Sequence, residues 1–208
     1  MRTKQVKITS TDPNLTIHVV LRVRSDDGRT MEEHVKVLKK SGRVLFAKIG
    51  KGLGGHFFDQ LNYQIENKIP TYFFIAVYEG WNQPFTFIKC DLIKVHSSIT
   101  DEQLELVPAY IQPSRKAVST WFEIAGLTRL ASEDVKRIQL ATSGREISSS
   151  LRGTTAIFRV VINGNTPLKT SALELKTQKK QTSSIDDDFV EDIDDDADYI
   201  DDFISSRK

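Results

Sequence analysis

The sequence predicts an α+β fold in which strands form a mixed sheet with helices beside it. An alternating stretch, TIHVVLRVR (16–24), places apolar side chains on one face, which is typical of a half-buried strand. TYFFIAVY (71–78) is the most apolar stretch, and FTFIKCDLIKV (85–95) follows across the polar turn EGWNQP, so the two predict a β-hairpin. Apolar residues at helical spacing over 31–40 and 56–67 predict two helices between these strands.

The remaining elements are predicted from local signals. Thr30 and Glu33 have the spacing of a capping box at the start of the first helix, and Gly42 is placed to end it. Pro70 breaks the second helix before the hairpin. The other segments are predicted as a strand over 43–49, a short helix from Thr100 and Asp101 to about Leu106, a strand over 118–128, a helix from Ser132 to about Leu140, a polar loop over 141–153 and a last strand over 154–162.

The composition is that of a globular protein. The chain has 208 residues, of which 39% are hydrophobic and 27% charged, enough for one full core plus an extra segment. No apolar run approaches the roughly 20 residues of a membrane helix, and MRTKQVKITS lacks the apolar centre of a signal peptide. A single cysteine, Cys90, rules out an intramolecular disulfide. We therefore expect a cytoplasmic protein that does not contact membranes.

Charge is distributed unevenly along the chain. The first 175 residues carry 24 basic and 17 acidic residues, a net of +7, and the rest carry 5 basic and 11 acidic residues, a net of −6. A basic body favours an anionic partner such as DNA or RNA. The acidic tail, residues 186–204, is expected to be disordered in isolation because so many like charges cannot pack together. It could bind a basic protein partner, compete with a polynucleotide for the body, or only aid solubility.

The segment GKGLGG (50–55) allows three interpretations. Its glycines match the Gly-x-Gly-x-x-Gly spacing of a dinucleotide-binding loop between a strand and a helix, and Glu79 stands where such folds hold the ribose hydroxyls. Alternatively, bare glycine amides beside Lys48 and Lys51 suit a phosphate of a polynucleotide, with Gly52 allowing close approach. A plain strand-to-helix turn is the third interpretation.

No catalytic signature is found, and we expect a protein that is not an enzyme. The four histidines are scattered without metal-binding spacing, so neither a metal nor another cofactor is expected. Glu174 and Lys176 give only a fragment of a nuclease motif, in a polar region.

Three blocks taken in order, GRVLFAKIGKG, IPTYFFIAVYEG…FTFIKCDLIKV and TWFEIAGLTRL…TSGREI, resemble the EVE-like branch of the PUA superfamily, which is related to YTH domains. The resemblance covers about residues 40 to 162. It implies a small curved mixed β-barrel (PUA-like) with flanking helices. The corresponding domains are an N-terminal strand and helix packed on the core (1–40), the barrel (41–163), and a polar linker with the acidic tail (164–208).

The resemblance also implies a function. Family members hold a modified base, flipped out of its strand, in an aromatic pocket beside a basic groove, and occur with bacterial restriction and anti-phage systems. The two tryptophans, Trp81 and Trp121, are the candidate pocket rings, although Trp121 lies in a predicted strand, where a tryptophan is more often a core residue. Ser143 and Arg145 could hold a phosphate or base edge, or lie in a solvated loop. The alternative functions are a protein-interaction subunit acting through the tail and a dinucleotide-binding enzyme.

Overall fold

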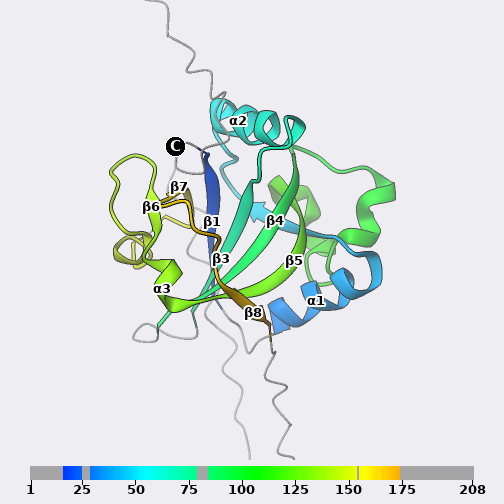
Figure 1. Cartoon of the computed structure of the whole chain (residues 1–208). Helices are drawn as coiled ribbons and strands as arrows, with labels where there is room; N and C mark the ends of the chain where they lie inside the picture. Colours follow the sequence, from blue (N-terminus) through cyan, green and yellow to red (C-terminus); the bar gives the residue numbers. More distant parts are fainter. Residues whose placement is uncertain (1–15, 25–28, 79–83, 154, 174–208) are drawn as a thin grey trace, which may run out of the picture. The chain divides into compact units, whose positions relative to one another are not determined.

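The computed structural model describes residues 16–24, 29–78, 84–153 and 155–173. Its centre is an eight-stranded mixed sheet in which seven strands follow the order β2-β5-β4-β3-β1-β7-β6, while β8 pairs with β5. Figure 1 shows β1, β3, β4 and β5 side by side at the middle of the sheet. The strands are β1 (His18–Arg24), β2 (Val44–Ile49), β3 (Tyr72–Tyr78), β4 (Thr86–His96), β5 (Val118–Leu130), β6 (Ile138–Leu140), β7 (Ile157–Ile162) and β8 (Thr170–Ala172).

The α+β class is confirmed, but the predicted barrel is not closed. The strand order begins at β2 and ends at β6, and these two end strands do not pair with each other. The pair β1 and β3 is parallel, whereas the other described pairs are antiparallel, so the sheet is mixed. The predicted hairpin of residues 71–95 is confirmed by the antiparallel register of β3 and β4.

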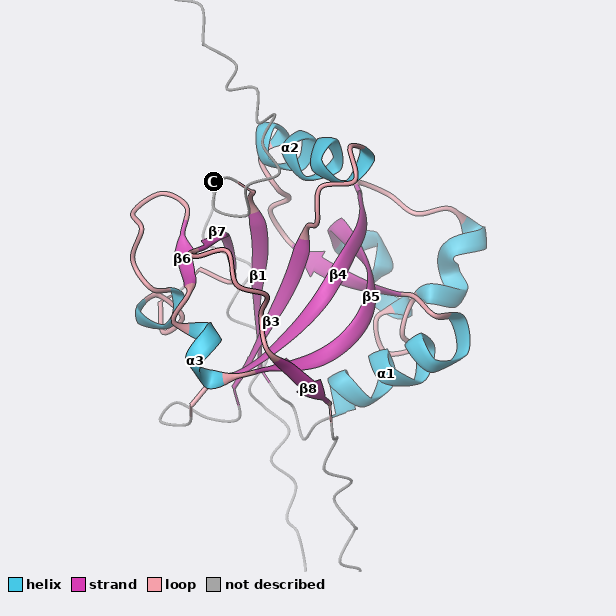
Figure 2. Ribbon diagram, viewed as in Figure 1, coloured by secondary structure: helices cyan, strands magenta, loops and turns pink. Residues whose placement is uncertain are grey.

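Helices α1 (Arg29–Ser41) and α2 (Gly55–Glu66) both pack on the apolar cluster of one sheet face. In Figure 2, α2 lies at the upper ends of the central strands and α1 at the lower right, near β5 and β8. Each is amphipathic: Met31 of α1 and Leu61 of α2 are buried in one cluster with sheet residues such as Phe73. Burial of an apolar side chain of this size contributes about 1.5–3 kcal/mol, so this contact fixes both helices. Gly42, at φ 69°, ends α1 as predicted, with its amide donating to the carbonyl of Leu38 at 2.8 Å.

The other face of the sheet holds two smaller clusters. Alternation along the strands sends Val19 and Phe73 to the helix-covered face and Val20 and Phe74 to the opposite one. One cluster there contains Val20 and Phe74 together with Ile147. The other packs Trp121 beneath two 3-10 helices, η1 (Asp101–Leu106) and η2 (Gln112–Ala117). No helix in the described residues has the length and apolar character that a membrane crossing demands.

A buried glutamine ties α2 to the sheet. Gln64 is fully buried, and its Oε1 accepts a hydrogen bond from the Ile17 amide at 3.0 Å. Its Nε2 donates to the Ile17 carbonyl at 2.8 Å and to Thr71 Oγ1 at 3.1 Å. Because every polar group of this side chain has a partner, its burial is compatible with a stable core.

Several predicted elements differ from the structure. The predicted helix from Ser132 to about Leu140 is wrong beyond its first turn: α3 spans only Ser132–Val135, and β6 follows, paired with β7. The predicted loop over 141–153 buries Ile147, which starts the 3-10 helix η3 (Ile147–Ser149). Thr30 lies within α1, which begins one residue earlier, so it does not cap the helix, whereas Thr100 does form a capping box with Gln103.

The domain limits also differ from the expected ones. β1 lies between β3 and β7, inside the sheet, so the N-terminal segment contributes a central strand. β8 pairs Thr170 with Leu130 of β5, which extends the sheet past residue 163, where we expected the linker to begin.

Candidate nucleic-acid interface

Residues 50–55, the glycine loop, lie against the start of β5. The amide of Gly50 donates to the carbonyl of Ala117 at 3.4 Å, and the amide of Leu53 donates to Thr120 Oγ1 at 3.3 Å. Gly50 has φ 84°, a conformation that favours glycine. A Cβ atom at Gly52 would lie 3.5 Å from Ser119, an ordinary contact, so this glycine is not needed to avoid a clash. Two amides of the loop are thus bonded to its neighbours, one to the last residue of η2 and one to a side-chain hydroxyl of β5.

Four cations gather where this loop meets η2. Lys48 and Lys51 flank Gly50, while Arg115 and Lys116 immediately precede Ala117, to which Gly50 is bonded. Lys48 is half-buried and the other three residues are exposed. Neither contributing segment, AKIGKGLGG (47–55) nor QPSRKAVST (112–120), contains an acidic residue. We call Lys48, Lys51, Arg115 and Lys116 the basic cluster; within the described part of the chain none of them forms an ion pair.

The first turn of α2 adds amide donors to the same region. Gly54 is its N-cap residue, in an extended conformation, and neither a side-chain cap nor an acidic residue is present in the first turn. The amides of Gly55 and His56 therefore lie where a helix offers no internal acceptor. Together with the partial positive charge at the helix start, they favour an anion beside the basic cluster.

The topology contradicts the dinucleotide interpretation of the glycines. That fingerprint belongs to a strand–helix–strand unit whose strands are parallel and close together in one sheet. Here β5 and β4 separate β2 from β3, and the three antiparallel pairings that connect them make β2 and β3 antiparallel. Glu79, the proposed ribose ligand, lies outside the described residues.

Trp121 is a core residue and does not line an open pocket. It is 2% exposed and packs with Leu45, Leu106, Val107 and Ile111. Because side chains alternate along β5, the Trp121 ring lies on the face covered by the 3-10 helices, where a ligand cannot stack on it. The expectation that it walls a base pocket is therefore wrong. Trp81, the other candidate ring, lies outside the described residues.

Ser143 and Arg145 are exposed but far from the glycine loop. They lie in the turn after β6, where the Leu140 amide donates to the Arg145 carbonyl at 2.8 Å. β6 and β2 stand at opposite ends of the strand order, six strand spacings apart. At about 4.8 Å per spacing, this is on the order of 30 Å along the sheet. The structure thus brings Lys48, Lys51 and Gly52 together but not Ser143 and Arg145.

Sequence reasoning missed Arg115 and Lys116. Their proximity to Lys48 depends on the antiparallel pairing of β2 with β5, in which Ile49 lies opposite Val118. The only local signal is the dipeptide Arg115–Lys116 without a nearby acid, which is common on protein surfaces.

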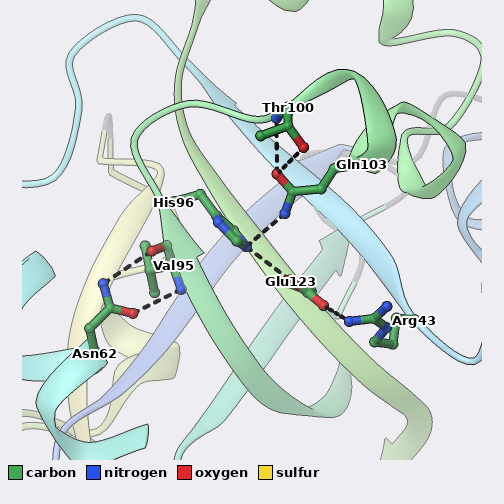
Figure 3. A network of polar contacts seen from close by, with 7 residues as sticks. All are labelled: Arg43, Asn62, Val95, His96, Thr100, Gln103 and Glu123. Carbon is green, nitrogen blue, oxygen red and sulfur yellow. Dashed lines mark hydrogen bonds and ion pairs between the residues drawn. The ribbon is translucent and has the colours of Figure 1, made fainter. Parts of the chain in front are cut away.

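A largely buried polar network centred on Glu123 has a structural role. Glu123 is 4% exposed and accepts hydrogen bonds from Arg43 Nη1 at 2.6 Å and from His96 Nε2 at 2.9 Å, as Figure 3 shows. Gln103 Nε2 lies 3.4 Å from the same histidine nitrogen, while Gln103 Oε1 accepts from the Thr100 amide. The network joins β4, β5 and η1 to Arg43, which directly precedes β2, and none of its side chains is among the buried unpaired groups of the described residues.

Of the other three histidines, His18 and His34 are buried, whereas His56 is exposed. The pKa of His18 is lowered to about 3, mainly by burial and further by the positive charge of Lys89. Its Nδ1 accepts from the Tyr72 amide at 3.1 Å, and its ring stacks on Tyr72, which Lys89 Nζ covers at 4.0 Å. Burial lowers the pKa of His34 to about 4. No group of metal-binding side chains occurs among the described residues.

Comparison with known proteins gives no relative: no family model, no curated protein and no solved structure matches the chain.

Proposed function

We propose that this protein is a nucleic-acid-binding module that contacts phosphates through the basic cluster. The observation that carries this proposal is the convergence of four cations, from two segments about 65 residues apart, at the contact between Gly50 and Ala117. Phosphate contacts of this kind position a protein on the polynucleotide without reading its sequence.

The charges around the cluster support an anionic partner over a neutral one. The first 175 residues carry a net charge of +7, and the cluster itself contains no carboxylate that would neutralise it. Each cation that neutralises a phosphate releases a condensed counterion, so binding should weaken steeply as salt is raised. The amides at the start of α2 would donate hydrogen bonds to a phosphate oxygen without any side-chain movement.

The resemblance to EVE-like domains extends the proposal to a modified or flipped base. An unstacked base offers its face to an aromatic ring and its polar edge to hydrogen bonds. We assign the stacking role to Trp81, because Trp121 is enclosed in the core. Trp81 stands in the polar segment EGWNQP, whose sequence offers a large apolar ring few apolar neighbours.

A binding panel tests the proposal. Fluorescence anisotropy would be measured with single-stranded and duplex DNA and RNA, plain and carrying modified bases, at low salt. We expect binding to at least one class, lost when Lys51 and Lys116 are both replaced by alanine. If Trp81 reads a base, Trp81→Ala removes the preference for the modified probe and leaves plain binding intact. Absence of binding to every probe at low salt would refute the function.

A further inference from the structure

Ile49 is an apolar side chain standing in the middle of the basic cluster. Four large hydrophobic residues of the described chain are exposed: Ile49 at 58%, Tyr110 at 47%, Tyr63 at 45% and Ile93 at 37%. Ile49 is the most exposed of them, and it lies directly between Lys48 and Gly50. An isoleucine left in water forgoes the free energy that burial of its side chain would supply, which a partner could recover.

The backbone holds Ile49 in a fixed position. Ile49 pairs with Val118 at the end of β2, and the register shifts between Lys48 and Ile49, which leaves Ser119 of β5 as the extra residue of an irregular pairing. On either side, Ser119 Oγ donates to the Lys48 carbonyl at 3.0 Å and the Gly50 amide donates to Ala117. Little backbone freedom remains to be lost when Ile49 meets a partner.

The surroundings of Ile49 favour duplex nucleic acid among the possible partners. Single-stranded sites rely on exposed aromatic rings for stacking. Of the exposed tyrosines, Tyr63 lies on α2, and Tyr110, between η1 and η2, packs edge-on against His34 of α1. A membrane surface requires several apolar side chains or a second anchor, and a protein interface requires an extended apolar centre. Duplex-bending proteins instead insert single apolar wedges between base steps, with cations on the flanking phosphates.

We propose that Ile49 is such a wedge: it enters between two base pairs of a duplex and kinks it while the basic cluster holds the phosphates on either side. This inference rests on the proposed nucleic-acid function and adds to it the kind of nucleic acid and its deformation. The wedge supplies apolar contact, whereas Lys48, Lys51, Arg115 and Lys116 supply the salt-dependent part of the affinity.

The test uses the full chain and a duplex of about 20 base pairs with a donor and an acceptor dye at its ends and 2-aminopurine inside. Wild-type protein should increase both the energy transfer, which reports bending, and the 2-aminopurine fluorescence, which reports unstacking. Ile49→Ser should bind about tenfold more weakly, keep the same salt dependence and give neither signal. Ile49→Leu should retain both signals. Tyr63→Ser is the matched control, because it also removes an exposed hydrophobic side chain, but from α2 and not from the basic cluster.

The outcomes separate the two proposals. Wild-type protein that binds the duplex without bending or unstacking it, or Ile49→Ser protein that still gives both signals, overturns the wedge and leaves nucleic-acid binding standing. Binding that depends on Ile49 but is seen only with phosphatidylserine vesicles overturns it in favour of a membrane. If wild-type protein binds no nucleic acid, the proposed function itself falls and the wedge with it.

Discussion

Replacing Glu123 should destabilise the fold far more than replacing the arginine that pairs with it. Glu123 is buried and accepts from both Arg43 and His96. The side chain of Arg43 is 54% exposed, whereas that of His96 is 11% exposed. When Glu123 is removed, Arg43 can therefore turn into water, but the Nε2–H of His96 stays buried without an acceptor.

The magnitude follows from these exposures. Leaving a buried donor unsatisfied costs about 1–3 kcal/mol. An ion pair with one exposed partner contributes about 0.2–1 kcal/mol. Glu123→Ala should thus lower the free energy of unfolding by about 1–4 kcal/mol, and Arg43→Ala by less than about 1 kcal/mol.

Urea unfolding followed by circular dichroism at neutral pH measures both values. Lys36→Ala serves as a control, because its ion pair with Glu33 on α1 lies at the surface. The reasoning is refuted if Arg43→Ala destabilises the protein as much as Glu123→Ala does, since the buried histidine would then not be the partner that matters.

Three further predictions concern pH, the glycine loop and the tail. Burial lowers the pKa of His18 from 6.5 to about 3. Between these pH values His18 is protonated in the unfolded chain but neutral in the folded chain. As the pH is lowered from 6.5 to about 3, stability should fall, with His18 contributing up to about 1.4 kcal/mol per pH unit and His34, whose pKa is lowered to about 4, adding to the slope; His18→Gln should make the slope shallower in urea titrations and leave the part due to His34, and an unchanged slope would count against the reasoning. Gly50→Ala should cost about 1–2 kcal/mol because its φ is 84°, whereas Gly55→Ala, at a position without positive φ where a Cβ meets nothing within 4 Å, should not lower the unfolding free energy; equal costs would show that backbone conformation is not the cause. Deleting residues 183–208 removes 11 acidic and 2 basic residues, so affinity for nucleic acid at low salt should rise; unchanged affinity would remove the idea that the tail competes with a polynucleotide.

Long elements with a clear period were predictable from the sequence. The helices over 31–40 and 56–67 and the hairpin over 71–95 occur within a few residues of their predicted limits. Each contains enough residues to show which face is apolar. β6 and β8 have three residues each, too few for a period, and they exist because β7 and β5 offer free edges. Closure of the sheet into a barrel likewise depends on whether the end strands β2 and β6 pair, and no local sequence pattern predicts that.

The candidate site was only partly predictable for a similar reason. Lys48, Lys51 and Gly52 share one loop, and their sequence proximity revealed them. Arg115 and Lys116 join them through strand pairing, and Arg145 is separated from them by the same sheet. Trp121 sits in a strand with apolar residues on both faces, so its sequence could not decide between core and pocket.

The salt dependence of nucleic-acid binding tests the basic cluster most directly. The double variant Lys51→Ala with Lys116→Ala would be compared with Lys136→Ala and Arg145→Ala, which remove two exposed cations from the opposite edge of the sheet. If the cluster holds phosphates, the slope of log K against log salt should become shallower by about 1.4–1.8 in the first variant and stay at the wild-type value in the second. Equal slopes for the two double variants would contradict the account.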